Sequence, residues 1–513
     1  MESQPPASCP AGGFPRRLFW LLFTASLVLR LLVLGLNAHH AHPFFFEPDS
    51  TDYLRDAADL SRGMGLRDLQ GAPSMRRPPG YSAVLALLFA GGLASPSAPI
   101  GAILLQMILS ALTVPLAARI AFILGGARAA LVAGILLALE PSAIASSDLI
   151  MSETLYTFAL VGAFALWSRW WLHPSGASLT LLACLIGALP LIRPAGTYLP
   201  FLFTLLILGW GPPGIKAVRA ALVFLLLSLA PLAVWKTRNY VLLESTEVSS
   251  IGPWVQAMFA RSVQEMAGET PPPAAPWSQD FAREQELTGA QAMEIQSAYF
   301  RRTVQSHPLL AARRFLLNAA VMVGVPNDRL VILTSEHPPP LMGGSIEARL
   351  AWLRRTGPFA LLLVLGMAIS LGGIVCLPWL VRRARSWDPH RQSLAFAAAG
   401  VVVYQWGIAS LIQYQADRYR IPMMPLLAVA LAVVVLGAAS RKGRWAAAAA
   451  GRSSGGLRED GSEGVRQSAL AIAAGQLLGV VFEPAKIHVD PLADVPRVQD
   501  RVARAGIALR RYA

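Results

Sequence analysis

Charged residues are scarce in this sequence: only 14% of its 513 residues are Asp, Glu, Lys or Arg, whereas 54% are hydrophobic. The apolar residues form long unbroken blocks and do not follow amphipathic spacing. This composition excludes an ordinary water-soluble globular protein and is typical of a polytopic membrane protein.

Cysteine is also rare. Cys9 lies in the N-terminal tail, while Cys184 and Cys376 lie inside apolar blocks, so neither a disulfide framework nor a Cys-rich metal site is expected. The sequence contains no Gly-rich phosphate loop, nucleophile elbow or zinc-protease helix motif. Nucleotide-driven chemistry on the cytoplasmic side is therefore not expected.

The net charge of +14 is distributed mainly over arginines at the ends of the apolar blocks. Such positions hold orientation signals and contact lipid phosphates. We interpret the basic excess as membrane topology and anionic-lipid chemistry, and we expect no nucleic-acid partner.

The apolar blocks predict the membrane spans, each of which needs about 20 residues, or about 17 when flanking residues adjust. The first block follows Arg16 and Arg17, is too long for the core of a signal peptide and lacks a small-residue cleavage site, so we expect a retained signal anchor. The ten predicted spans are Leu18–Leu36, Ile100–Leu124, Ala129–Ala145, Leu155–Leu172, Leu179–Ile192, Tyr198–Trp210, Val218–Trp235, Phe359–Val381, Leu394–Ile412 and Met423–Ala439.

The orientation depends on the shorter apolar segment Gly80–Ala94. If this segment lies along the outer interface, every inner segment carries basic residues, including the dense cluster at 382–391. If it spans the membrane, that cluster moves outside, which the positive-inside rule disfavours. We therefore expect an all-α membrane protein with both termini cytoplasmic. Its predicted parts are an N-terminal tail (1–17), a transmembrane domain (18–439) with interfacial helices in a first outer loop (37–98) and a long second outer loop (237–357), and a cytoplasmic tail of unknown role (440–513).

Carboxylates follow the first span closely, at Asp49 and Asp52, and lead into a predicted surface helix over Tyr53–Arg62. An Asp at this position is often a helix N-cap. A carboxylate held just outside the bilayer is also suited to act as a general base on an acceptor hydroxyl or amine. The spacing leaves both interpretations open.

Arg76 and Arg77 precede a Pro-Pro segment that begins the interfacial helix. Two arginines here can reach lipid headgroups while the proline sets the helix start. Guanidinium groups held by a rigid segment also suit bidentate binding of a phosphate or pyrophosphate leaving group.

Further charged residues mark the outer ends of later spans. Glu153 follows Ser152 at the start of an apolar run, and Glu140 precedes Pro141, so these carboxylates are expected either to cap helices or to face an active cavity. Arginines also stand at four outer positions that break the positive-inside rule, which predicts a local anionic partner such as a lipid phosphate. These are Arg193, Arg238, Arg418 and Arg420.

Three histidines, His39, His40 and His42, crowd the start of the first outer loop. Such a cluster can bind Zn²⁺, but the spacing of carboxylates and cysteines that accompanies most zinc sites is missing. We assign no metal ligand and no cofactor, and a divalent metal stays an open alternative.

Several short motifs, taken together, resemble glycosyltransferase family 39 and related GT-C enzymes over about Leu18 to Ala439. In chain order they are Asp49 with Tyr53, Ala57-Ala58-Asp59-Leu60 with Gly63 and Gly65, Arg77-Pro78-Pro79-Gly80-Tyr81, Glu140-Pro141, Ser152-Glu153, Arg193-Pro194, Arg238-Asn239-Tyr240 and Arg418-Tyr419-Arg420-Ile421-Pro422. Two departures are Ser50, where many relatives have a second acidic residue, and Ser82, where a proline is expected. The first departure leaves open whether Asp49 or Asp52 is the base, and Asp49 fits the spacing to Tyr53 better.

The resemblance implies a GT-C bundle that transfers a sugar from a polyprenyl- or dolichyl-phosphate carrier to a lipid, glycan or protein acceptor on the outer face. Protein O-mannosyltransferases and lipid A aminoarabinose transferases are such enzymes. By this resemblance Asp49 is the base, Asp52 and Glu153 shape the site, and the arginines at 76, 77, 193, 238, 418 and 420 bind the donor phosphate. We expect an inverting hexosyl- or pentosyltransferase, in the bacterial inner membrane. The alternatives are a flippase or transporter for a lipid-linked glycan, and an oligosaccharide ligase or polymerase.

Overall fold

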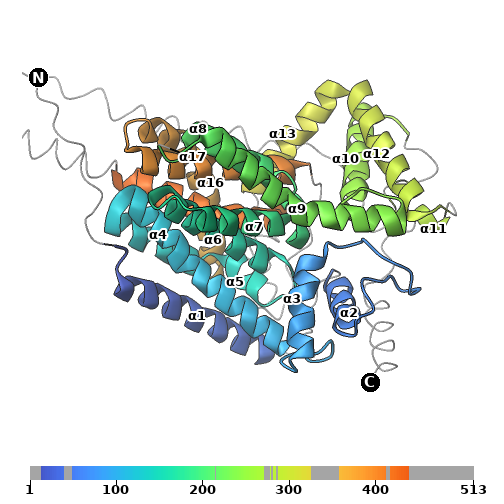
Figure 1. Ribbon diagram of the computed structural model, residues 1–513, viewed down its shortest axis with the longest axis horizontal. Coiled ribbons are helices and arrows are strands. Elements are labelled where there is room, and N and C mark those ends of the chain that lie inside the picture. The colour runs from blue at the N-terminus through green and yellow to red at the C-terminus, as the bar shows by residue number, and fades with distance from the viewer. Residues whose placement is uncertain are drawn as a thin grey trace, which may run out of the picture. The chain divides into compact units, whose positions relative to one another are not determined.

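The computed structural model describes residues 13–39, 49–213, 215–270, 276, 278, 281–284, 287–324, 358–411 and 416–437. These residues form helices and connecting turns, and their β-structure is limited to one isolated bridge between Arg67 and Pro73 (Figure 1). They all belong to one compact unit, Met1–Ala439. The predicted tail over 440–513 lies outside the described residues.

The helices before the long outer segment carry most of the apolar blocks. They are α1 (Arg16–His39), α2 (Ser50–Ser61), α3 (Pro79–Ala90), α4 (Ile100–Ala138), α5 (Pro141–Ser147), α6 (Glu153–Leu172), α7 (Gly176–Ile192), the 3₁₀ turn η1 (Pro194–Gly196), α8 (Leu199–Trp210) and α9 (Ala217–Leu243).

The remaining helices form the outer segment and the last spans. They are α10 (Ile251–Ala267), α11 (Phe281–Glu284), α12 (Gly289–Ser306), α13 (Pro308–Gly324), α16 (Pro358–Ala384), α17 (Pro389–Ser410), α18 (Ala416–Arg420) and the 3₁₀ turn η2 (Ile421–Met423), after which the chain stays helical to Gly437.

Six helical stretches of the described chain are long and apolar enough to cross a membrane, which confirms the predicted all-α polytopic membrane protein. Three shorter apolar helical stretches accompany them, at Pro79–Ala90, Gly176–Ile192 and Pro194–Trp210. Each of the ten predicted apolar blocks coincides largely with a helix or with one half of α4. The six stretches are Arg16–Leu36, Ile100–Ala138, Ala217–Leu243, Leu361–Ala384, Pro389–Ser410 and Arg418–Gly437.

The predicted span Ile100–Leu124 and the first part of the predicted span Ala129–Ala145 lie within α4, on either side of Gly126. The backbone of Gly126 has φ 82° and ψ −172°, which a residue with a side chain rarely adopts. Residues before and after Gly126 lie close together. Val114 and Leu137 line the same cavity, and Ser110 Oγ donates a hydrogen bond of 3.2 Å to the carbonyl of Ala143. The two halves therefore run antiparallel, as two successive spans.

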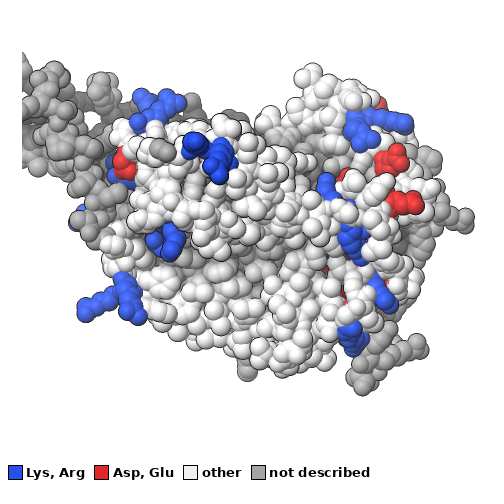
Figure 2. Space-filling model, in the orientation of Figure 1, with Lys and Arg blue, Asp and Glu red and all other residues white. Residues whose placement is uncertain are grey.

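The helix ends predicted to be cytoplasmic lie together. Arg391 donates to the carbonyl of Leu124, the rings of Trp171 and His390 are in tilted contact with centroids 5.0 Å apart, and Trp171 Nε1 donates to the carbonyl of Trp210 at 3.1 Å. On the face shown in Figure 2, charged side chains gather toward the two ends of the bundle and leave a largely uncharged surface between them. The helix ends thus fall into two groups, as the predicted topology requires. Which group faces the cytoplasm stays a prediction.

The first outer segment carries two short helices, α2 and α3. With 12 residues, α3 is about 18 Å long, too short for a hydrocarbon core of about 30 Å. Its length agrees with the predicted interfacial helix over Gly80–Ala94. At Gly80 a Cβ atom would stand 2.7 Å from the carbonyl oxygen of Leu191, so a glycine is needed where α3 packs on α7.

The loop predicted to be the second outer one contains α10, α12 and α13, which contact one another (Figure 1). A capping box formed by Thr288 and Gln291 starts α12, because each side chain satisfies a backbone N–H of the other.

Candidate active site

Asp49 precedes α2 but does not cap it, since its side chain makes no capping hydrogen bond. One carboxylate oxygen instead accepts from Arg77 Nη2, and the other lies 2.8 Å from Arg418 Nη1. The interpretation of Asp49 as a helix cap is therefore wrong. Its carboxylate joins the first outer loop to the segment before the last span.

Glu153, the first residue of α6, forms the second acidic centre. Its Oε1 lies 2.6 Å from Arg193 Nη1 and also accepts from Arg418 Nε. Arg418 therefore bridges Glu153 and Asp49, and four segments distant in sequence meet at one point. Charge-assisted contacts of this kind are stronger than neutral hydrogen bonds.

Asp52 lies one turn along α2 and is held by arginines of the same loop. Its Oδ2 is 2.6 Å from Arg76 Nε and 3.5 Å from Arg77 Nε, and its Oδ1 is 3.5 Å from Arg55 Nη2. Arg77 thus contacts both Asp49 and Asp52. The arrangement fixes the Arg76-Arg77 pair against α2.

Two tyrosines and a serine support these arginines, and sequence reasoning gave them no role. Tyr53 and Tyr419 place their rings 5.4 Å from the guanidinium carbons of Arg77 and Arg193, within cation–π range. Ser152 Oγ lies 3.0 Å from the hydroxyl of Tyr53 and accepts from Arg193 Nη1 at 3.2 Å. The sequence signal for these residues is that each is adjacent to a charged candidate: Tyr53 follows Asp52, Tyr419 follows Arg418 and Ser152 precedes Glu153.

The alternatives of a helix cap or a cavity-facing carboxylate, left open for Glu140 and Glu153, have different outcomes: Glu153 faces the cluster. Ser152 precedes α6 without a side-chain capping bond, because its hydroxyl faces the cluster. Glu140 does cap α5, accepting from the N–H groups of Ser142 and Ala143 at 3.1 and 2.6 Å. Glu140 is therefore a structural cap and not a member of the cluster.

The three carboxylate side chains differ in the fraction of their surface that is exposed. The side chain of Asp49 is 23% exposed, whereas those of Asp52 and Glu153 are 12% and 2% exposed. Burial disfavours ionisation of Asp49, but the guanidinium groups of Arg77 and Arg418 outweigh it and lower the pKa of Asp49 below its usual value. Of the three, Asp49 is the carboxylate that a solute can reach most readily, and it is ionised at neutral pH.

Within the part of the chain that the structure describes, Arg238 and Arg420 donate hydrogen bonds to backbone carbonyls outside the cluster. Arg238 Nη1 donates to the carbonyl of Ser74 at 2.8 Å and its Nη2 to that of Leu66 at 3.4 Å, so it fixes the loop that carries Arg76 and Arg77. The side chain of Arg420 is fully buried and its Nη1 donates to the carbonyl of Met322 at 3.1 Å. Both contacts hold backbone segments in place.

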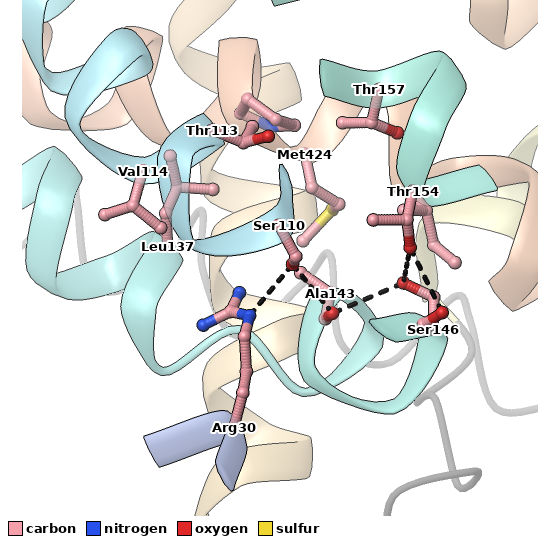
Figure 3. Close-up of a pocket in the computed structure, with 12 residues that line it drawn as sticks. Arg30, Ser110, Thr113, Val114, Leu137, Ala143, Ser146, Thr154, Thr157 and Met424 are labelled. Atoms are coloured by element: carbon pink, nitrogen blue, oxygen red, sulfur yellow. Dashed lines mark hydrogen bonds between the residues drawn. The ribbon is translucent and has the colours of Figure 1, made fainter. Parts of the chain in front are cut away.

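A small cavity of about 20 Å³, lined by both apolar and polar side chains, lies in the bundle close to the start of α6 (Figure 3). Arg30 extends into it from α1, donating to Ser110 Oγ at 2.9 Å, and Thr154 lines its other side. Arg30 Nη2 and Thr157 Oγ1 have no hydrogen-bond partner among the described residues. A cavity of this volume has room for one water molecule.

The described residues contain no group of three or more His, Cys, Asp or Glu side chains placed to hold a metal ion. Of the predicted histidine cluster, His40 and His42 lie outside the described residues. All three candidate acids contact arginines, which are not metal ligands.

The cluster offers three arginines, Arg77, Arg193 and Arg418, around the two carboxylates Asp49 and Glu153. One positive charge is therefore in excess. Arg76 and Asp52 beside them balance each other. Guanidinium groups bind the oxygens of phosphate in the same geometry as those of carboxylate. The site is chemically suited to hold a phosphate group of low charge beside an accessible carboxylate.

No protein-family model and no curated protein matches this chain. Among solved structures, the oligosaccharyltransferase of Archaeoglobus fulgidus in the apo form is 13% identical, with a TM-score of 0.47, over 90% of this chain and 54% of that one. ArnT from Cupriavidus metallidurans bound to undecaprenyl phosphate is 14% identical, with a TM-score of 0.39, over 82% of this chain and 60% of that one. The chain thus spans little more than half the length of the archaeal enzyme.

Proposed function

We propose that this chain is a GT-C-type membrane glycosyltransferase that takes a sugar from a polyprenyl-phosphate carrier at the Arg418 end of the bundle. The observation that carries the proposal is the contact of Asp49 with Arg77 and Arg418. An accessible carboxylate and an excess of guanidinium groups then stand together at the ends of apolar helices. The ordered motifs that resemble family 39 fall on the same residues.

The reaction that fits this geometry is a single displacement at the anomeric carbon. The acceptor oxygen or nitrogen bonds to that carbon, its proton passes to Asp49, and the bond from the carbon to the phosphate oxygen breaks. The phosphate leaves with the electron pair as polyprenyl phosphate. Arg77, Arg193 and Arg418 neutralise the charge that develops on it.

The three acids then have different roles. Asp49 is the base because it is the most exposed of them. Glu153 is buried between Arg193 and Arg418 and holds both guanidinium groups in place. Asp52 holds Arg76 and Arg77 in the same way. Glu153 and Asp52 are therefore positioning residues in this proposal.

The test is a transfer assay on the purified protein in lipid vesicles, with a synthetic polyprenyl-phosphate sugar as donor and a cell-envelope fraction as acceptor source. We expect labelled sugar to appear on an acceptor without any sugar nucleotide. A strict requirement for a sugar nucleotide would contradict the proposal. Transport of the intact donor across the vesicle membrane by the same preparation, without transfer, would instead identify a flippase.

A further inference from the structure

Helix α13 presents two chemically different faces. One face packs on the spans: Asn318 Nδ2 donates to the carbonyl of Ser410 at 2.9 Å, and Trp406 Nε1 donates to the carbonyl of Ala319 at 3.0 Å. Near the end of the helix, the carbonyl of Met322 accepts from Arg420. These bonds fix α13 to the end of α17 and to α18, which carries Arg418.

The opposite face of α13 is apolar and exposed. Leu309, Leu316, Leu317 and Val321 are 84%, 66%, 42% and 48% exposed. Their spacing of seven, eight and twelve residues places them along one side of the helix. Moving one such side chain from water into an apolar environment contributes up to about 1.5–3 kcal/mol, so four of them together favour burial strongly.

The exposed apolar face belongs to a helix that packs on predicted membrane spans. α13 contacts α16 and α17, both long and apolar enough to cross a membrane. The start of α16 also exposes apolar side chains, with Leu361 and Val364 73% and 57% exposed. An exposed apolar face on a helix that packs against membrane spans has the bilayer as its natural cover.

We propose that α13 is an interfacial helix whose Leu309–Val321 face lies in the lipid leaflet at the Arg418 end of the bundle. Its 17 residues span about 25 Å, a length common among helices that lie in the membrane plane. Arg313 is exposed within this face, one turn from Leu309 and Leu317, and its long side chain can extend to lipid phosphates while its methylene groups stay among the apolar residues. Through Met322 and α18, the helix then joins the lipid surface to the segment that holds Arg418.

This placement of α13 does not depend on the proposed glycosyltransferase activity. The helix was not predicted to contact lipid because its apolar residues are interrupted by Arg313, Arg314 and Asn318.

The test is environment-sensitive fluorescence of the full chain in lipid vesicles. A single cysteine replaces Leu316 in a background without Cys9, Cys184 and Cys376, and it is labelled with a nitrobenzoxadiazole dye. Glu294→Cys on α12, also exposed, is the matched control. Val321→Cys gives an independent second position should Leu316→Cys fail to fold.

We expect brominated lipids to reduce the fluorescence at positions 316 and 321 and to leave position 294 unchanged, whereas aqueous iodide should act in the opposite order. Equal quenching of positions 316 and 294 by iodide would overturn the proposal. Efficient disulfide cross-linking at position 316 between two copies would also overturn it, because a second copy of the chain would then cover this face.

Discussion

In the proposed mechanism, the carboxylate of Asp49 and the donor phosphate compete for the same arginines. The two oxygens of Asp49 contact Arg77 and Arg418, which we propose for the phosphate. On this proposal, a donor phosphate that binds both guanidinium groups displaces the carboxylate from them. The replacement Asp49→Asn should abolish transfer and, at the same time, tighten the binding of polyprenyl phosphate.

The magnitude follows from the distances. Asp49 Oδ2 lies 2.8 Å from Arg418 Nη1, and opposite unit charges about 4 Å apart attract by about 4 kcal/mol at an effective dielectric constant near 20. If only a third of that attraction is lost when phosphate replaces the carboxylate, the difference of about 1.4 kcal/mol makes binding about tenfold tighter in the variant. Loss of the base lowers the transfer rate by ~10²–10⁴-fold.

The assay is titration calorimetry of polyprenyl phosphate into the wild-type protein and the variant, both in nanodiscs, together with the transfer rate. Asp52→Asn is the control, because Arg76 and Arg55 share that carboxylate and a smaller change in affinity is expected. An unchanged or weaker affinity of Asp49→Asn for polyprenyl phosphate would refute the competition. Near-normal transfer by Asp49→Asn with an inactive Asp52→Asn would instead move the base to Asp52.

Three further predictions follow from other contacts. Arg418→Ala should raise the KM for the lipid donor more than Arg76→Ala does, because Arg418 bridges two carboxylates whereas the side chain of Arg76 is 43% exposed. Steady-state kinetics of both variants checks this, and an equal rise in KM would count against the bridging role of Arg418. A cysteine at position 385 should react with an impermeant maleimide only from the cytoplasmic side, and one at position 302 only from the outside. Labelling of intact cells and of inverted vesicles checks this, and labelling of position 385 from the outside would reverse the predicted topology. Burial raises the pKa of Asp56 to about 6, above its ordinary value of 3.8, so the folded state binds this proton more tightly and stability should rise as pH falls from about 6 toward 4. The variant Asp56→Asn should lack this rise in melting temperature, and a pH profile identical to that of the wild type would argue against a role of Asp56.

The spans were predictable from sequence because a continuous apolar block of sufficient length has few other folds available. The reversal within α4 was predictable as well, since two apolar blocks flank the short Gly125–Arg128 segment and Gly126 supplies the backbone conformation of the turn. The exposed apolar face of α13 was not predictable from the sequence, because its apolar residues are too few and too interrupted to resemble a span.

The members of the site were largely predictable, but their pairing was not. A charge at the outer end of a span is costly and therefore informative. Asp49 and Arg418, however, are 369 residues apart and meet only through the packing of the helices. Arg238 and Arg420 look like Arg418 in the sequence, and only the contacts of Arg238 with Ser74 and of Arg420 with Met322 separate them from it.

The central claim is that Asp49 accepts the proton of the acceptor while the neighbouring arginines receive the phosphate. Its most direct test is a single-turnover measurement with a labelled polyprenyl-phosphate sugar prebound to the wild-type protein, to Asp49→Asn and to Arg418→Ala, all in vesicles, after addition of the acceptor fraction. We predict rapid release of polyprenyl phosphate by the wild type, negligible release by donor-saturated Asp49→Asn, and slowed release by Arg418→Ala. Release by Asp49→Asn at the wild-type rate would contradict the account.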